Sequence, residues 1–358
     1  MSLLFSPLRI KNIDLKNRIV VSPMCQYSAD EGYANDWHLV HLGSRAVGGA
    51  GLILLEATAV SPEGRISAED LGIWSDDHIP VLKRITAFLH ANGSVAGIQL
   101  GHAGRKGSSG SPWKGGKKVS EANGGWKTVA PSAVPFQESD EAPAALTAEG
   151  IEKVRTDFKA AARRALDAGF KVIEIHAAHG YLLHQFLSPL SNQRSDAYGG
   201  SFENRIRLVL EVVDDIKEVW PEENPLFVRI SASDWADGGW TADESIALSS
   251  ILKDKGVDLI DCSSGGLAAH QQIPIFPGYQ VQFSEDIKKQ AGILTGAVGL
   301  ITDAEQAESI LTEGKADLIF LARELLRDPY FPLHAAQILN EDIKWPDQYD
   351  RAKPRKSK

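Results

Sequence analysis

The sequence predicts a single (β/α)₈ barrel. Eight short apolar runs alternate with longer segments that have the periodicity of amphipathic helices, and eight parallel strands are the number that closes such a barrel. Glycines also end the intervening helices shortly before an apolar run, as at Gly169, Gly256 and Gly314. This order suits parallel strands joined by right-handed crossovers.

The strands are expected at residues 18–22, 51–57, 94–100, 171–176, 226–231, 257–263, 292–296 and 317–322. A helix is predicted over 36–47 with Asp36 as its cap, and another over 151–166, where an apolar stripe faces the sheet. Capping boxes at Thr241–Glu244 and Thr302–Glu305 begin later helices.

A long segment from Gly101 to Ala145 contains eight glycines and no sustained periodicity. Long loops inside compact domains are usually functional, and the loops that follow barrel strands build the active site. The pocket is therefore expected to take its shape from loops 107–145 and 265–281. A doubly wound sheet is the competing architecture, but the Gly-x-Gly-x-x-Gly that such a sheet uses after its first strand is missing.

Composition narrows the function classes. The 358 residues are 43% hydrophobic and 24% charged, as in ordinary folded proteins, and no linker divides the predicted domain, residues 1–358. The net charge of −9 argues against a nucleic-acid surface, and the basic segment 352–358 is expected to be a flexible, solvated tail. No basic region followed by an apolar run begins the chain, so we expect a cytoplasmic protein without a membrane span.

Cysteine usage excludes further classes. Only Cys25 and Cys262 occur, so a disulfide framework and any four-cysteine metal site are excluded. Cys262 is expected in the core, and Cys25 has no evident base beside it. Tyr27 would point the same way as Cys25 if this segment were extended.

The stretch 171–182 supplies the candidate chemistry. Its apolar strand gives way to His176, His179 and Tyr181, and two imidazoles with a phenol can stabilise an oxyanion and supply a proton. A zinc site is the alternative interpretation, because two histidines three residues apart can bind zinc, and His38 and His41 repeat this spacing. Zinc normally takes three protein ligands, however. His38 and His41 lie in a predicted helix, where packing or a surface position is favoured.

Two further features point to an anionic ligand. Arg229 lies within an apolar strand, so an acidic or carbonyl-rich partner should face its guanidinium. The seventh strand is followed by Gly296 and Gly299 and the eighth by Ala322 and Arg323. A phosphate commonly binds after these two strands of a barrel, although ordinary glycine turns would give the same glycines.

The chain resembles the old yellow enzyme family of flavin-dependent ene-reductases, in particular its bacterial thermophilic-like or xenobiotic-reductase-A-type branch. The resemblance covers nearly the whole chain and rests on four motifs beyond the opening Leu-Phe-Ser-Pro. These are Pro23-Met-Cys-Gln-Tyr27, Gln99-Leu-Gly-His-Ala-Gly-Arg-Lys106, His176-x-x-His179-Gly-Tyr181 and Arg194-Ser-Asp-Ala-Tyr-Gly-Gly-Ser-x-Glu-Asn-Arg205.

The resemblance implies a noncovalent FMN at the carboxyl end of the barrel. Pro23, Cys25 and Ala57 would contact the edge of the ring near N5 and O4, Gln99 the pyrimidine side, and Arg229 the N1–O2 edge, where its charge would stabilise the reduced ring. Gly296, Gly299 and Arg323 would hold the phosphate. The implied cofactor-binding set is Ser22, Pro23, Met24, Cys25, Ala57, Gln99, Arg229, Gly296, Gly299, Ala322 and Arg323.

The implied activity is that of an NAD(P)H:flavin oxidoreductase. NADPH or NADH would reduce the flavin, which would then reduce the activated C=C bond of an enone, maleimide, nitroalkene or quinone. His176 and His179 would bind the substrate oxygen, and Tyr181 would protonate the α-carbon, giving net trans addition.

The family pattern also implies substrate contacts from Tyr27 and Lys106 and an arginine, here Arg351, that enters a neighbouring subunit's site. A homodimer or homotetramer would follow. The larger dienoyl-CoA-reductase type needs an iron–sulfur site and further domains, which two cysteines and 358 residues do not provide. A zinc hydrolase and a noncatalytic flavin-storage protein are the alternatives from other classes.

Overall fold

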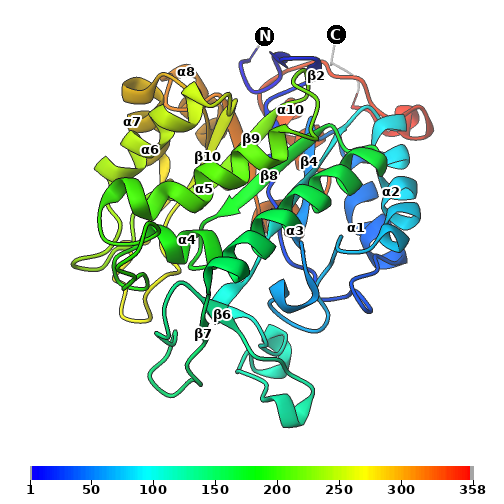
Figure 1. The fold of residues 1–358 in the computed structure, drawn as a ribbon. Helices are drawn as coiled ribbons and strands as arrows, with labels where there is room; N and C mark the ends of the chain where they lie inside the picture. The colour runs from blue at the N-terminus through cyan, green and yellow to red at the C-terminus, as the bar shows by residue number, and fades with distance from the viewer. Residues whose placement is uncertain (1, 355–358) are drawn as a thin grey trace.

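The computed structural model describes residues 2–354 as a closed barrel of parallel strands surrounded by helices (Figure 1). Neighbouring strands follow the order β10-β11-β12-β3-β4-β5-β8-β9. Their bounds are β3 (Ile19–Val21), β4 (Leu52–Ala59), β5 (Val95–Gly101), β8 (Val172–Ala177), β9 (Leu226–Ser231), β10 (Leu259–Ser263), β11 (Leu294–Ala297) and β12 (Leu318–Leu321). Each of the eight predicted strands is confirmed.

Ten α-helices lie in the described residues: α1 (Asp36–Val47), α2 (Ile79–Ala91), α3 (Ala148–Asp167), α4 (Leu182–Leu187), α5 (Phe202–Lys217), α6 (Ala242–Asp254), α7 (Val281–Ala291), α8 (Ala304–Thr312), α9 (Arg323–Arg327) and α10 (Phe331–Ile338). The predicted stripe of α3, which includes Ile151, Val154 and Phe158, is buried. Gly169, Gly256 and Gly314 have positive φ angles after their helices, so these three helix ends are confirmed.

Two of the predicted helix caps are displaced by one residue. Asn35, not Asp36, caps α1, because its side chain accepts from the Trp37 N–H while the backbone N–H of Asn35 donates to Nδ1 of His38. Asp303, not Thr302, caps α8 by accepting from the Gln306 N–H. The Thr241–Glu244 capping box of α6 is confirmed.

The two ends of the barrel differ. A hairpin of β1 (Leu8–Ile10) and β2 (Ile13–Leu15) lies at the end where both termini are found (Figure 1). The segment 102–147, which contains β6 (Val129–Ala130) and β7 (Ala144–Ala145), projects from the opposite end (Figure 1). The carboxyl ends of the parallel strands face this second end, where barrel enzymes carry their active sites.

The barrel interior is filled with apolar side chains rather than left open as a pore. Phe227 and Phe320 pack there with residues from most of the strands and from the hairpin. This cluster consists of Ile10, Ile13, Leu15, Val20, Leu52, Leu54, Val172, Phe227, Leu259, Val298, Leu318 and Phe320. The core therefore forms a rigid floor beneath the strand ends.

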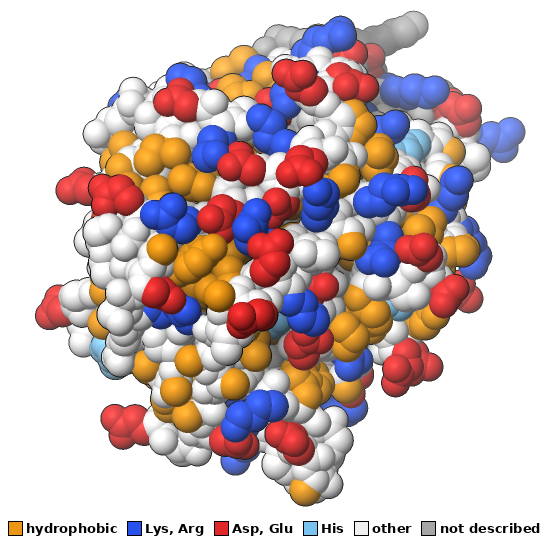
Figure 2. Space-filling view, in the orientation of Figure 1, with side chains coloured by type: hydrophobic (Ala, Val, Ile, Leu, Met, Phe, Trp, Pro, Cys, Tyr) orange, Lys and Arg blue, Asp and Glu red, His pale blue; other side chains and the backbone are white. Residues whose placement is uncertain are grey.

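The surface is mixed in character. Figure 2 shows acidic and basic side chains dispersed together over the face in view, with apolar patches between them. No helix within residues 2–354 is both long and apolar enough to cross a membrane. Of the predicted basic tail, residues 355–358 lie outside the described part of the chain.

Gly296 provides a test of the packing. A Cβ at this position on β11 would lie 2.2 Å from Cε2 of Phe320, so Gly296→Ala should lower the free energy of unfolding by about 1–3 kcal/mol. Urea unfolding measures the change. Gly110→Ala is the control, because the nearest heavy atom to its added Cβ lies 3.8 Å away, and an equal loss in both variants would contradict the packing argument.

Candidate active site

The structure brings the predicted His176, His179 and Tyr181 together at the end of β8. The ring of His176 lies 5.1 Å from that of His179 and 5.0 Å from that of Tyr181, edge to face in both cases. His176 is a strand residue, His179 lies in the following turn, and Tyr181 precedes α4 as its N-cap residue. The three rings therefore form one cluster, although they come from a strand, a turn and a helix cap.

Backbone contacts fix the turn that carries this cluster. His179 and Gly180 both have left-handed backbone, with φ of +58° and +72°. The His179 N–H donates to Oγ of Ser231 at 2.9 Å, and the Gly180 N–H donates to Nδ1 of His184 at 2.9 Å. A Cβ on Gly180 would lie 2.2 Å from the Gly266 carbonyl oxygen, so the close approach of the two loops requires glycine here.

A buried polar network, which sequence reasoning missed, supports the turn from behind. Because Nδ1 of His184 accepts a hydrogen bond, its proton is on Nε2, which lies 2.8 Å from Oδ1 of Asp234. Oδ2 of Asp234 accepts from Ser188 at 2.6 Å and from the Trp240 N–H at 2.8 Å. Burial raises the pKa of Asp234, but these partners outweigh it and lower the pKa. The sequence signal was His184 within the largely apolar segment 182–187.

Burial sets the protonation state of the three rings. It lowers the pKa of His176 and His179 well below the usual range, with the positive charge of Arg229 as the next cause. It raises the pKa of Tyr181 well above its usual range. At neutral pH the site therefore holds two neutral imidazoles and a protonated phenol. Nδ1 of His176 has no hydrogen-bond partner in the described chain, whereas Nε2 of His179 lies 2.7 Å from Oγ of Ser263.

Arg229 lies beside the cluster because of the strand register. His176 on β8, Arg229 on β9 and Asp261 on β10 are aligned in one row across the barrel. The Nε of Arg229 is 3.1 Å from Oδ2 of Asp261, and its Nη1 donates to Oγ of Ser22 at 3.1 Å. The predicted acidic partner of Arg229 is thus confirmed as Asp261, a residue that the sequence analysis did not name.

Gln99 lies on β5, opposite Glu174 of the neighbouring strand β8. Its Nε2 donates to Oε1 of Glu174 at 2.8 Å, and both side chains are buried. Burial raises the pKa of Glu174 well above its usual range, and the charge of Asp261 raises it further. The amide of Gln99 is thereby held with its nitrogen toward β8.

A cavity lies after β11 and β12, where the sequence predicted a phosphate site. It has a volume of about 180 Å³, and Arg229, Gly299, Ala322 and Arg323 are among its lining residues. Tyr279 and Gln280, which sequence reasoning missed, also line it. Gly296 does not, because the ring of Phe320 occupies the space beside its backbone. Two guanidinium groups facing one cavity suit an anionic group.

The segment after β3 departs from its expected conformation. Tyr27 has a φ of +48°, so the chain is not extended at this residue. Its side chain nevertheless interacts with that of Cys25, and its ring packs edge to face against Trp113 of the projecting segment, 5.7 Å between centroids. Cys25 is half-buried, and burial raises the pKa of its thiol, which does not favour a nucleophilic thiolate. Cys262 is buried in the core, as predicted.

The remaining residues of this segment and Ala57 also lie around the strand ends. Ser22 is buried, Pro23 and Met24 are half-buried, and the Gln26 N–H donates to Oε2 of Glu56 at 2.6 Å. Ala57 lines a small cavity together with His176 and Tyr181. The proposed cofactor-contacting residues of β3 and β4 thus lie on the same side of the barrel as the ring cluster.

Lys106 joins the two loops above the site. Its Nζ donates to the carbonyl oxygens of His179 and Gly266, at 2.9 Å each, and lies 5.3 Å from the centre of the Tyr181 ring. Both of these acceptors are uncharged carbonyl oxygens, so neither supplies a negative charge to balance the ammonium group. Burial lowers its pKa to about 8, and Arg105 and Lys118 act in the same direction.

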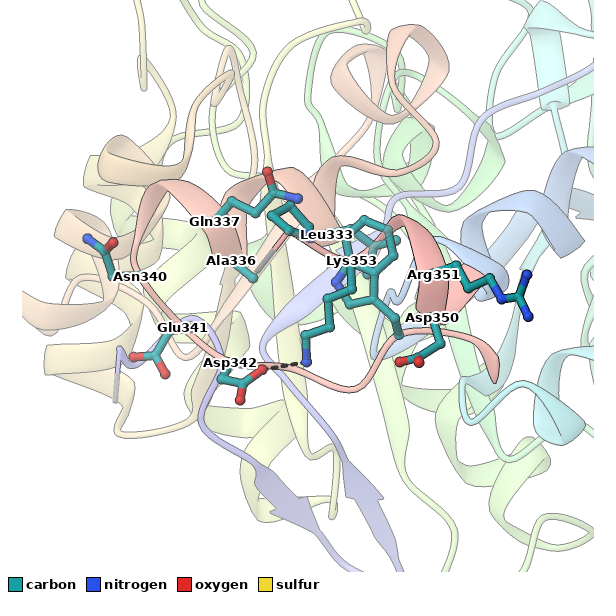
Figure 3. Close-up of a pocket in the computed structure, with 11 residues that line it drawn as sticks. Leu333, Ala336, Gln337, Asn340, Glu341, Asp342, Asp350, Arg351 and Lys353 are labelled. Atoms are coloured by element: carbon teal, nitrogen blue, oxygen red, sulfur yellow. Dashed lines mark hydrogen bonds and ion pairs between the residues drawn. The ribbon is translucent and has the colours of Figure 1, made fainter. Parts of the chain in front are cut away.

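Arg351 lies away from this cluster in the same chain. It belongs to a 3₁₀ turn, Asp347–Ala352, at the end of the barrel that carries both termini (Figure 1). It lines a cavity of about 550 Å³, and its side chain points away from the Lys353–Asp342 ion pair in this cavity (Figure 3). The structure therefore does not bring Arg351 to the ring cluster of its own barrel.

The other histidine pair is structural. His38 and His41 are buried on α1, and His38 closes the cap of that helix. Burial lowers the pKa of His41 to about 3. Within residues 2–354 there is no group of three or more His, Cys, Asp or Glu side chains that could hold a metal ion.

Comparison with known proteins gives concordant matches. Residues 3–342 match the NADH:flavin oxidoreductase / NADH oxidase family. The chain is 54% identical to an NADPH dehydrogenase of Bacillus velezensis over 98% of both chains. Among solved structures, morphinone reductase in complex with tetrahydroNAD is 28% identical with a TM-score of 0.76, covering 96% of this chain and 92% of that one. An old yellow enzyme homologue from Zymomonas mobilis is 26% identical with a TM-score of 0.76, covering 98% and 99%.

The buried charge of Lys106 should leave a signature in the pH dependence of stability. Its pKa is about 8 in the folded chain and about 10.5 when exposed, so between these values the unfolded state binds more protons and the free energy of unfolding rises with pH. Lys106→Met removes this titration. The free energy of unfolding of the wild type, relative to that of the variant, should rise by on the order of 1–3 kcal/mol between pH 7.5 and 10.5.

Urea unfolding at the two pH values measures this difference. Lys114→Met is the control, because Lys114 is exposed and paired with Glu69. If the difference in the free energy of unfolding does not change with pH, burial does not disfavour the charged form of Lys106.

Proposed function

The chain belongs to the NADH:flavin oxidoreductase / NADH oxidase family, the old yellow enzyme superfamily, and we propose that it is an ene-reductase that reduces the activated C=C bond of α,β-unsaturated carbonyl or nitro compounds. It is an oxidoreductase, as its curated relatives at more than 50% identity are. The observation that carries the finer proposal is the pair of neutral imidazoles, His176 and His179, beside the protonated phenol of Tyr181. Hydrogen-bond donors and a proton donor are what reduction of an enone requires.

The residues present fit FMN. Arg229 is buried, its Nε faces Asp261 at 3.1 Å and its Nη1 donates to Ser22. A guanidinium group has five N–H donors, so a further acceptor suits the donors that these two partners do not use. Its other side faces the cavity that Gly299 and Arg323 line, which suits a phosphate. We propose that the edge of the flavin ring is contacted by Arg229, Gln99, Cys25 and neighbouring residues. When bound, FMN supplies the hydride that reaches the β-carbon of the substrate.

The chain's own residues supply the rest of the chemistry. His176 and His179 bind the carbonyl or nitro oxygen and draw electron density from the alkene. Tyr181 donates its proton to the α-carbon, and its raised pKa keeps that proton in place until charge develops there. Tyr27 and Lys106 line a neighbouring outer cavity, which shares Ile66 with the small cavity of His176 and Tyr181. We propose NADPH as the reductant, which the Bacillus velezensis relative supports.

Three narrower assignments extend the proposal. From Cys25 we propose that the chain belongs to the bacterial thermophilic-like branch. Arg351, which does not reach the site of its own barrel, serves the neighbouring subunit of a homodimer or homotetramer. We also place the enzyme in the cytoplasm. Sedimentation of the purified protein tests the oligomer, and an unaltered activity of Arg351→Ala would remove Arg351 from the site.

The function is tested with the purified protein. It should be yellow, with the visible absorption of bound flavin, and 2-cyclohexenone should accelerate its NADPH consumption. The saturated ketone, cyclohexanone, is the control and should not. A colourless protein that does not act on the enone would refute the proposal, whereas a yellow protein without turnover would indicate flavin storage.

Tyr181→Phe tests the proton donor. The variant should reduce 2-cyclohexenone about 10²–10⁴-fold more slowly, because the acid is lost, while reduction of its flavin by NADPH keeps the wild-type rate. Stopped-flow absorbance measures the two half-reactions separately. Tyr198→Phe is a matched control, because Tyr198 hydrogen-bonds to Glu211 outside the site. Equal slowing of both half-reactions would exclude Tyr181 as the acid.

A further inference from the structure

Two neighbouring cavities lie between the ring cluster and the projecting segment. An inner cavity is lined by His176, Tyr181 and Ile66, and Ile66 also lines an outer cavity of about 580 Å³. Tyr27 and Lys106 lie on the wall of the outer cavity. A ligand that reaches Tyr181 from outside can therefore extend its remaining atoms along this wall.

The outer wall carries three lysines and one carboxylate among its lining residues in the described chain, Lys106, Lys117, Lys118 and Asp140. The Nζ of Lys118 donates to the carbonyl oxygens of Arg105 and Gly107. An ammonium group has three N–H donors, so one donor of Lys118 remains available. Burial lowers the pKa of Lys118 to about 8, because it disfavours the charged ammonium form. A bound anion would stabilise that form and raise the pKa again.

The neighbouring charges leave the wall positive. Asp140 raises the pKa of Lys118 and Arg105 lowers it, and one oxygen of Asp140 already accepts from the Gln137 N–H at 3.1 Å. Asp140 makes no ion pair with these lysines in the described chain. Lys117 is exposed, and no side-chain partner of it lies among the described residues. Lys114 on the same segment differs, because it is paired with Glu69.

We propose that Lys117 and Lys118 bind the phosphate groups of the reducing dinucleotide, above all the 2′-phosphate that distinguishes NADPH from NADH. This rests on the proposed function, in which the nicotinamide ring reaches the flavin beside His176. The cavity of Arg229 and Arg323 is assigned to the flavin phosphate, so the dinucleotide must leave in the other direction, past Ile66. Its phosphates then pass the lysine wall.

The experiment compares Lys117→Ala, Lys118→Gln and the double variant with wild-type holoenzyme. The KM for NADPH should rise roughly tenfold or more in the double variant, because charge-assisted hydrogen bonds are lost, while the KM for NADH changes little. Lys118→Arg, which keeps the charge, should restore much of the preference for NADPH. Lys114→Ala is the matched control and should behave as wild type.

Oxidation of the dithionite-reduced holoenzyme by 2-cyclohexenone is measured in parallel and should be unchanged, because this half-reaction needs no dinucleotide. An unchanged ratio of kcat/KM for NADPH and NADH would overturn the proposal, and so would an equal weakening of both dinucleotides. Slower oxidation by the enone with unaltered KM for NADPH would instead assign the lysines to substrate. Lys117 is exposed, so its variant tests the proposal even if Lys118 variants fold poorly.

If the wild-type enzyme does not reduce the enone, the proposed function fails. The dinucleotide proposal can still be tested in that case, with molecular oxygen as the electron acceptor and the same comparison of NADPH with NADH.

Discussion

The buried cation Arg229 is the constraint on which the site depends. Burying a guanidinium group is costly without partners, and the parallel register supplies Asp261 on one side and places His176 on the other. Burial, and next the same positive charge, lower the pKa of the two neighbouring imidazoles, so both are neutral at neutral pH. One residue thus joins the cavity lined by Arg323 to the ring cluster of His176.

The barrel turns this row of side chains into a defined site. Its packed interior fixes the strand ends, and the left-handed turn at His179 and Gly180 is held by contacts from β9, from α4 and from the loop after β10. A backbone conformation that is unfavourable for a histidine persists only where its surroundings determine it this strongly. The geometry of the three rings is accordingly a property of the whole barrel and not of the motif alone.

The sequence predicted the parts that depend on local pattern. Apolar runs located all eight strands, and an arginine within such a run predicted a buried ion pair. It did not predict contacts that depend on three-dimensional packing: the His184–Asp234 network, the positive φ of Tyr27, or the ring of Phe320 that accounts for Gly296. Caps were displaced by one residue because Asn35 and Asp303 compete with equally suitable neighbours. The position of Arg351 could not be predicted from local pattern, because it depends on the path of the whole chain.

We propose that hydride and proton reach the alkene from opposite sides, the hydride from bound flavin and the proton from Tyr181. Reduction of 2-methyl-2-cyclohexenone with NADPH that carries deuterium at both C4 positions tests it most directly, with the product analysed by NMR before its α-carbon can exchange. Deuterium at the β-carbon, on the face opposite to the new hydrogen at the α-carbon, is the predicted result. Both atoms on the same face, or no deuterium at the β-carbon, would contradict the account.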